Sequence, residues 1–506
     1  MRIFEILTLI TLFLALVKGF LPVGKRPSWT TYLPGAAILM ILIHFVTVGY
    51  RWQIAPSYAL AILLFVFSIP QLLGKSIDSP TRGGHKMLNR MGLTVGLVFF
   101  AFAAALPVWF PLFEMPNPTG PYAVGTTSFA FTDESRPEIF TADPADNRLV
   151  YVQAWYPAGS TADAARAPMW IDPENIITPL TKEFPLPEVM FSHLASVQSH
   201  SYFDAPLAED PLAEQETVYP ILVYSHGYDA GFFAQNMVQM EELASHGYII
   251  FSIGHTYESG LVFDAQGRVV PMSETQKGAF YKEDDEVNEL YRKIFSTTGA
   301  EQIQAARAWM AASPIAQQST QIWMQDTQFV LTQIEQMNSG QVASPFTGHL
   351  DTARIGVFGH SFGGSTAFQV CAVDSRCQAA INMDGSQWGN LLDNPLQTPF
   401  MMMSGENSVG INDWALSNAL ENGYNIYVRD AYHINFTDFN LVSPLFKFPL
   451  WGALGSIDTR QMERIMNSYT LAFFDQTLKG IPSPLLQGDS PDYPEVEFKI
   501  FDAISE

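Results

Sequence analysis

Cysteine and basic residues are scarce in this sequence, and each scarcity excludes a class of function. Only two of the 506 residues are cysteine, and neither has a histidine nearby at ligand spacing, which argues against a metal site. Lysine and arginine together number 27 against 50 acidic residues, and charged residues make up only 15% of the chain. At this length we expect at least two structural units rather than one core.

The few charges are unevenly distributed. Residues 1–116 hold nine Lys/Arg against three Asp/Glu, whereas the rest of the chain holds 18 against 47. An acidic body of this kind repels nucleic acid at long range, so we expect no nucleic-acid partner. The chain therefore combines a basic, apolar front with an acidic body.

The front contains hydrophobic runs long enough to cross a membrane, for which about 20 apolar residues are needed. They cover approximately residues 34–50, 55–73 and 92–112, and a weaker one covers 3–21, where Glu5 and Lys18 interrupt it. The weaker run can also be interpreted as a signal peptide, but no small-residue cleavage site follows it. We therefore predict a region of four transmembrane helices over residues 1–113.

Basic residues in the loops predict the orientation of these spans. Lys18, Lys25 and Arg26 follow the first run, and four more basic residues lie between positions 75 and 90. Placing both loops inside satisfies the positive-inside preference and leaves both termini outside. We therefore expect a multi-pass protein of the cell membrane whose acidic body is extracytoplasmic.

The body alternates strand-like and helix-like segments, which is typical of an α/β fold. A proline-rich linker, residues 114–122, precedes it. Short apolar runs suited to buried parallel strands recur through the body, and a helical pattern covers about 320–337. The runs lie at 148–156, 221–225, 248–253, 355–358, 379–383, 400–403 and 425–428. Two longer stretches, about 157–218 and 260–319, have no place in a minimal sheet, and we expect them to be insertions over an active site.

A nucleophile elbow is predicted at Gly359-His-Ser361-Phe-Gly363, which matches G-x-S-x-G. The motif alone is weak evidence, but an apolar strand enters it and a helix rich in small residues leaves it. An elbow requires this context, because the serine backbone is strained and bulky neighbours would collide. We therefore predict an α/β-hydrolase fold over residues 123–506, with Ser361 as its nucleophile.

Chain order identifies the base, because in this fold the acid and then the histidine follow the serine. His433 is the only histidine after Ser361. The acid is less determined: Asp384 follows the strand-like run after the elbow helix, whereas Glu406 and Asp413 follow the next run. The oxyanion hole requires two backbone N–H groups. We expect Phe362 to supply one and Tyr228, in the loop after an early strand, to supply the other.

These segments resemble the platelet-activating factor acetylhydrolase family, in its plasma-type branch with bacterial members. The similar segments are PTGPYAVGTT (118–127), SHGYDAG (225–231), GHSFGGSTA (359–367), INMDGS (381–386), HINFTDF (433–439) and residues 455–480. The resemblance implies Asp384 as the acid, the backbone of Tyr228 and Phe362 as the oxyanion hole, and no cofactor. Two features depart from the family: an aromatic residue at 228, where vertebrate members have an aliphatic one, and the apolar front.

The expected function is hydrolysis of carboxylic esters through an acyl-enzyme, on short or oxidised acyl chains of lipids or similar small esters. A general carboxylesterase or polyester hydrolase is the alternative enzyme. An inactive hydrolase-like adhesion or sensor module is the alternative of another class, and the presence of all three triad residues argues against it.

The two cysteines, Cys371 and Cys377, flank a turn-like segment between the elbow helix and the strand that ends before Asp384. An extracytoplasmic body lies in an oxidising compartment, which permits a disulfide. We therefore predict a Cys371–Cys377 bridge, with a pair of buried free thiols as the alternative.

Overall fold

The computed structural model describes residues 2–501, apart from positions 23–24, 74–82, 173–174, 178–186, 210–216, 411, 418, 422, 449 and 451. It divides into two compact units. The first comprises residues 1–113, 185–196 and 442–445. The second comprises 114–184, 197–441 and 446–506.

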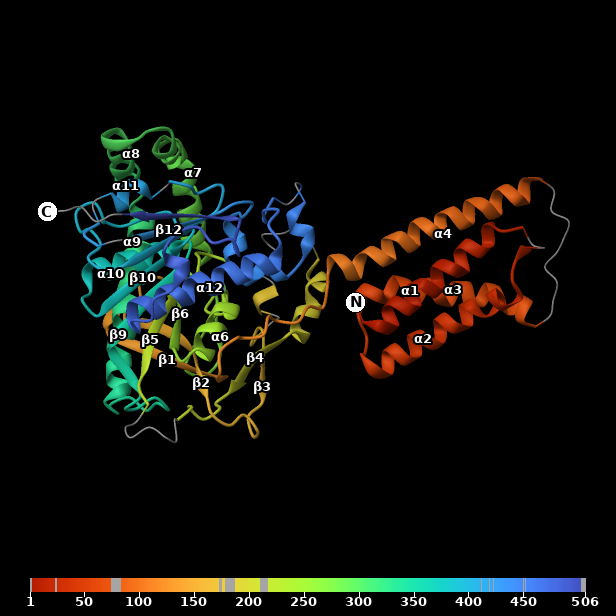
Figure 1. Cartoon of the computed structure of the whole chain (residues 1–506), viewed down its shortest axis with the longest axis horizontal. Coiled ribbons are helices and arrows are strands. Elements are labelled where there is room, and N and C mark those ends of the chain that lie inside the picture. Colours follow the sequence, from red (N-terminus) through yellow and green to blue (C-terminus); the bar gives the residue numbers. More distant parts are fainter. Residues whose placement is uncertain are drawn as a thin grey trace. The chain divides into compact units, whose positions relative to one another are not determined.

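Where the structure describes it, the first unit is built from four long apolar helices, α1 (Ile3–Val17), α2 (Leu33–Thr47), α3 (Ala55–Leu72) and α4 (Gly83–Trp109). Figure 1 draws them in red and orange. With their flanking turns they give four segments of a length and hydropathy that suit a membrane span, at Ile3–Phe20, Ser28–Thr47, Trp52–Leu72 and Arg90–Trp109. These candidates fall on the four predicted runs. The predicted orientation of the spans depends on the basic segment 75–90, and much of that segment lies outside the described residues.

Glu5, the acid that weakens the first apolar run, is buried among polar partners. Its Oε1 lies 3.2 Å from His44 Nε2 and pairs with the guanidinium of Arg51, and the hydroxyl of Tyr58 lies 3.0 Å from His44 Nδ1. A buried charge is tolerated where it is paired. The interruption in the sequence pattern is therefore compensated by contacts between helices.

In its described residues, the second unit is built on one mixed sheet of eleven strands, in the order β13-β12-β11-β10-β9-β5-β6-β2-β1-β4-β3. Its centre is six parallel strands from β6 to β12, and antiparallel strands flank it on both sides. The central strands are β5 (Tyr219–Ser225), β6 (Ile249–His255), β9 (Leu350–His360), β10 (Cys377–Met383), β11 (Phe400–Ser404) and β12 (Gly423–Val428). The flanking ones are β1 (Ala123–Pro137), β2 (Asn147–Ala158), β3 (Arg166–Pro168), β4 (Gln198–Phe203) and β13 (Val496–Phe501). A separate hairpin joins β7 (Val262–Phe263) and β8 (Val269–Val270).

Helices cover this sheet, as Figure 1 shows. Helix α6 (Met237–Ser245) packs against α12 (Thr459–Leu478), and α9 (Pro314–Asn338) packs against α10 (Phe362–Val373). The short α11 spans Asp413–Leu416. Every residue of β5 and β6 is buried, as expected for parallel strands covered on both faces. The prediction of a mostly parallel sheet with flanking helices, of α/β-hydrolase type, is confirmed.

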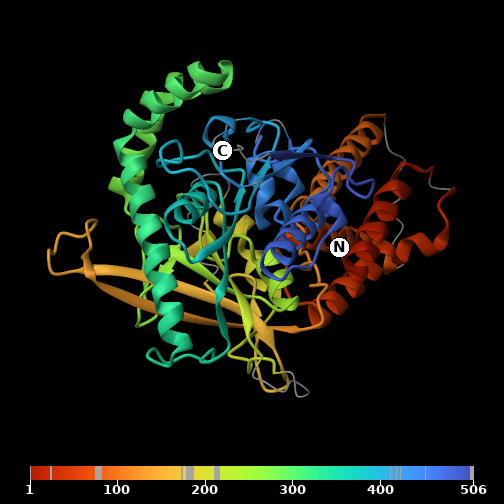
Figure 2. The same ribbon diagram turned by 60° about the vertical axis from the view of Figure 1, so that its left-hand side comes forward.

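The two predicted insertions are more ordered than the sequence suggested. Residues 260–319 contain two helices, α7 (Glu274–Ser296) and α8 (Gly299–Ala311), rather than an irregular stretch. Part of 157–218 joins the sheet as β3 and β4, beyond the long antiparallel ribbon of β1 and β2 that Figure 2 shows. This part of the first stretch extends the sheet at one end, because β1 offers an edge that β4 pairs with.

Cys371 and Cys377 form a disulfide, with their Cα atoms 5.1 Å apart. The bridge ties the last turn of α10 to the first residue of β10. The elbow helix and the strand leading to Asp384 are thus covalently joined.

Candidate active site

Ser361 stands at the sharp turn between β9 and α10. Its φ of 56° and ψ of −123° lie where non-glycine residues are strained, as a nucleophile elbow requires. Two glycines make the turn possible: a Cβ on Gly363 would lie 2.1 Å from the carbonyl oxygen of Ser225, and one on Gly359 would lie 2.4 Å from Gly363. The G-x-S-x-G spacing therefore follows from crowding against the end of β5.

The structure brings Ser361, His433 and Asp384 into one chain of hydrogen bonds. His433 Nε2 lies 2.9 Å from Ser361 Oγ, and His433 Nδ1 lies 2.6 Å from Asp384 Oδ2. With the carboxylate accepting, Nδ1 carries the proton and Nε2 is free to accept the serine proton. This is the arrangement a hydrolytic triad requires.

Of the three acids that the sequence left open, Asp384 is the one placed beside His433. Its second oxygen, Oδ1, accepts hydrogen bonds from the backbone N–H of Gly405, at 2.7 Å, and from the hydroxyl of Ser408. Glu406 instead accepts the backbone N–H of Asp430, and Asp413 begins α11. Ser408 was not anticipated, because nothing in the local sequence of a loop reveals which carboxylate it faces.

Tyr228 and Phe362, the predicted oxyanion residues, line the same cavity as Ser361, and their rings lie 5.6 Å apart. Gln235 fixes the loop that carries Tyr228, since its Oε1 accepts the backbone N–H of Gly227 at 2.8 Å. Gln235 lies eight positions after Gly227, in the turn before α6, and no motif signalled this contact.

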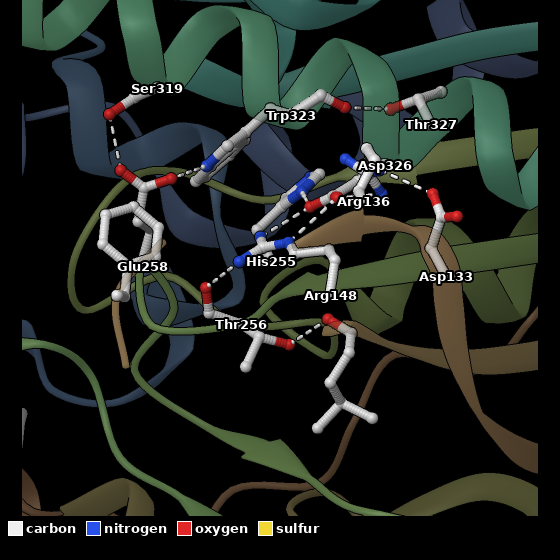
Figure 3. A network of polar contacts seen from close by, with 12 residues as sticks. Asp133, Arg136, Arg148, His255, Thr256, Glu258, Ser319, Trp323, Asp326 and Thr327 are labelled. Carbon is white, nitrogen blue, oxygen red and sulfur yellow. Dashed lines mark hydrogen bonds and ion pairs between the residues drawn. The ribbon is translucent and has the colours of Figure 1, made fainter. Parts of the chain in front are cut away.

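A network of buried polar groups lies behind this loop (Figure 3). His255 Nδ1 is 2.9 Å from Asp326 Oδ2, and His255 Nε2 is 3.1 Å from Ser225 Oγ. Asp326 is also bound by two arginines, Arg148 at 2.7 Å and Arg136 at 2.8 Å. A second Ser–His–Asp arrangement therefore exists here, but all three of its residues are fully buried.

The charges of the network explain its protonation. Burial alone would raise the pKa of Asp326, but the charge of Arg148 and the hydrogen bond from His255 bring it well below its ordinary value. Burial lowers the pKa of His255 to about 4, so this imidazole is neutral near pH 7. Trp323 stacks on the His255 ring at 3.9 Å and also meets the ring of Phe362 at 5.0 Å. The network thus supports the floor of the cavity.

The cavity above Ser361 has a volume of about 810 Å³. Its lining combines aromatic rings, among them Phe280, Tyr291 and Trp309 of α7 and α8, with a few polar groups. The second insertion therefore does border the site, as the sequence predicted. Among the described residues, no group of three or more histidines, cysteines and carboxylates is arranged to hold a metal ion.

Comparison with known proteins connects this geometry to a family. Residues 109–490 match the model of the family described as "Platelet-activating factor acetylhydrolase, isoform II". The platelet-activating factor acetylhydrolase of Cavia porcellus is 23% identical over 380 residues, which cover 72% of this chain and 78% of that protein. A probable 1-alkyl-2-acetylglycerophosphocholine esterase of Arthroderma benhamiae is 24% identical over 447 residues, 81% of this chain and 100% of that protein.

A solved structure gives the same picture. The ferulic acid esterase from Streptomyces cinnamoneus superposes with a TM-score of 0.56 at 25% identity, covering 76% of this chain and 98% of that one. The family match spans well over half of the chain and confirms the resemblance predicted from the motifs. The chain therefore belongs to the platelet-activating factor acetylhydrolase, isoform II family and is a carboxylic ester hydrolase of that type.

Proposed function

We propose that the chain is a serine esterase that works through Ser361, His433 and Asp384. His433 takes the proton of Ser361 as its Oγ attacks the ester carbonyl, and returns that proton to the departing alcohol. A water activated by the same imidazole then releases the acid from the acyl-enzyme. Asp384 holds the imidazole in the required tautomer. The observation that carries this proposal is the unbroken chain of bonds from Asp384 to Ser361.

In the same proposal the backbone N–H groups of Tyr228 and Phe362 stabilise the oxyanion. Phe362 is the first residue of α10, so its N–H is one of those that a helix leaves without an internal partner. Tyr228 follows Gly227, whose own N–H is held by Gln235. No metal or cofactor enters this mechanism.

The proposed substrates are short or oxidised acyl esters of phospholipids or similar lipids. Support comes from the curated relatives, which are named as hydrolases of acetylated phospholipids. A general carboxylesterase is the second candidate, because the neighbouring solved structure is a ferulic acid esterase and the cavity is much larger than an acetyl group requires.

The membrane part of the proposal is that four spans anchor the enzyme with its hydrolase unit on the extracytoplasmic side. Four apolar segments of suitable length, the basic loops between them and the disulfide of the hydrolase unit support this topology.

Labelling with a fluorophosphonate tests the chemistry. We expect the probe to label the wild-type protein on Ser361 and to leave Ser361→Ala unlabelled, with hydrolysis of 4-nitrophenyl acetate lost in parallel. A series of esters of increasing acyl length then separates the two substrate classes. Hydrolysis by Ser361→Ala at the wild-type rate would exclude the proposed mechanism.

A further inference from the structure

Helix α7 forms one wall of the cavity that contains Ser361. Among the described residues that line this cavity, five come from α7: Phe280, Tyr281, Asp284, Asn288 and Tyr291. Phe280, Asp284, Asn288 and Tyr291 follow one another at four, four and three residues, a spacing that puts them on one face of the helix. Phe280 stacks on the ring of Tyr228 at 4.0 Å, so this face begins beside the proposed oxyanion hole.

Contacts along its length hold α7 in place. Lys277 Nζ lies 2.6 Å from Asp229 Oδ2, in the loop that carries Tyr228. Glu283 accepts two backbone N–H groups from the first turn of α9, at 2.9 and 2.8 Å. The hydroxyl of Tyr291 lies 2.8 Å from Ser386 Oγ, two residues after Asp384. The wall is therefore tied to the oxyanion loop, to α9 and to the loop of the acid.

The lining of the cavity carries one sign of charge. Among the described residues that line it there are four aspartates and no lysine or arginine. Lys277 pairs with Asp229, and the Asp384 carboxylate accepts a hydrogen bond from His433. Asp438 is buried, and its Oδ2 accepts the backbone N–H of Val238 at 3.1 Å. Burial, with Glu463 nearby, raises the pKa of this carboxyl well above its ordinary value.

Asp284 is the carboxylate that remains open to the cavity. Its side chain is exposed, and no basic side chain among the described residues forms an ion pair with it. Its neighbours Glu283 and Asp285 have the same sign. Burial above all, and to a smaller extent the charges of Asp384 and Asp284, raise the pKa of Tyr291 to about 12, whereas its hydrogen bond with Ser386 lowers it.

We propose that α7 selects esters by the charge of their acyl tail, and that Asp284 excludes tails ending in a carboxylate. The cavity of about 810 Å³ holds far more than an acetyl group, so a longer tail extends along this wall. Aromatic rings offer it apolar contact, whereas an anion loses its hydration and gains no cation in return. This inference rests on the proposed ester hydrolysis at Ser361 and names its substrates more narrowly. Of oxidised acyl chains, those ending in an aldehyde are accepted and those ending in a carboxylate are rejected.

Two chromogenic esters with the same number of carbons test this selection. 4-Nitrophenyl hexanoate ends in a methyl group, and the mono-4-nitrophenyl ester of adipic acid ends in a carboxylate. The measured quantity is the ratio of their kcat/KM values at pH 8, where the tail is ionised, after correction for spontaneous hydrolysis. From the repulsion of two charges in a partly solvated site we expect the wild type to prefer the hexanoate about tenfold or more.

Asp284→Asn and Asp285→Asn form a matched pair, because both remove one charge from adjacent positions but only Asp284 lines the cavity. Asp284→Asn should lower the hexanoate-to-adipate ratio of kcat/KM values about threefold to tenfold. In the wild type, 0.5 M NaCl should also lower this ratio, because salt screens the repulsion between the two charges. Asp285→Asn should leave the ratio unchanged.

Equal rates on both esters in the wild type, or the same ratio in the wild type and both variants, would overturn the charge selection while leaving the esterase intact. If the wild type hydrolysed neither ester, or Ser361→Ala hydrolysed both as well as the wild type did, the proposed function itself would fail.

Discussion

Replacing Asp384 with asparagine tests the proposed mechanism with little change of shape. Oδ1 of the new side chain can still accept the N–H of Gly405 and the hydroxyl of Ser408, so the loop keeps its hydrogen bonds. The other position, 2.6 Å from His433 Nδ1, becomes an NH₂ group that meets a ring N–H. Two donors cannot share a hydrogen bond, so the imidazole should move its proton to Nε2.

The magnitude follows from that tautomer. A proton on Nε2, 2.9 Å from Ser361 Oγ, prevents His433 from accepting the serine proton. In serine proteases the equivalent change lowers kcat by about 10⁴, which corresponds to about 5.5 kcal/mol of transition-state stabilisation. We expect a loss of this order in kcat for 4-nitrophenyl acetate, with KM and the thermal midpoint nearly unchanged.

Two controls distinguish the tautomer from a general loss of negative charge. Glu406→Gln and Asp413→Asn remove a carboxylate from the two other candidate positions and should retain most of the activity. Ser408→Ala removes one hydrogen bond to Asp384. It should lower transition-state stabilisation by about 1 kcal/mol, which is about a fivefold to tenfold loss of kcat. If Asp384→Asn kept a tenth of the wild-type kcat, or if Glu406→Gln were the more damaging change, the assignment of the acid would be refuted.

Three further predictions concern the disulfide, the buried network and the membrane topology. Cys371→Ser/Cys377→Ser should lower the free energy of unfolding by about 2–3 kcal/mol in urea titrations, because the bridge closes a short loop; an equal midpoint with and without reductant would contradict this. Asp326→Asn should lower the free energy of unfolding by about 3–5 kcal/mol at pH 7, because it leaves the buried guanidinium group of Arg148, and that of Arg136, without this carboxylate partner. Folding lowers the pKa of Asp326, so this carboxylate contributes its full stabilisation above the unfolded pKa near 4 and less as the pH falls below it. The difference in free energy of unfolding between wild type and Asp326→Asn should therefore be smaller in urea titrations at pH 3 than at pH 7. A single cysteine introduced between positions 75 and 90 should resist a membrane-impermeant thiol reagent in intact cells and react after permeabilisation; labelling without permeabilisation would reverse the proposed topology.

The parts of the fold that the sequence predicted are those with strong local signals. The central strands are buried on both faces, so they stand out as continuous apolar runs such as Ile249–His255. His433 followed from chain order, because no other histidine comes after Ser361. The four apolar segments of the front were equally visible, as hydropathy over a whole helix is a large signal.

The parts that the sequence did not predict depend on contacts between distant segments. The helical insertion Glu274–Ala311 is mostly polar, so its pattern resembled an irregular stretch, although one face of α7 lines the cavity. The choice between Asp384, Glu406 and Asp413 required the positions of three loops at one edge of the sheet. The buried partners of His255 come from β5 and α9, which are about 30 and 71 residues away from it along the chain.

The buried Ser225–His255–Asp326 arrangement shows that distances alone do not identify a nucleophile. Ser225 and Ser361 each lie within hydrogen-bond reach of an imidazole that is in turn bound to a carboxylate. They differ in access: Ser361 lines a cavity, whereas Ser225 is fully buried at the end of β5. Searches of structures for catalytic constellations would count two sites in this one unit, yet only one of them can meet a substrate. A covalent inhibitor matched to triad geometry alone would therefore still find a single target here.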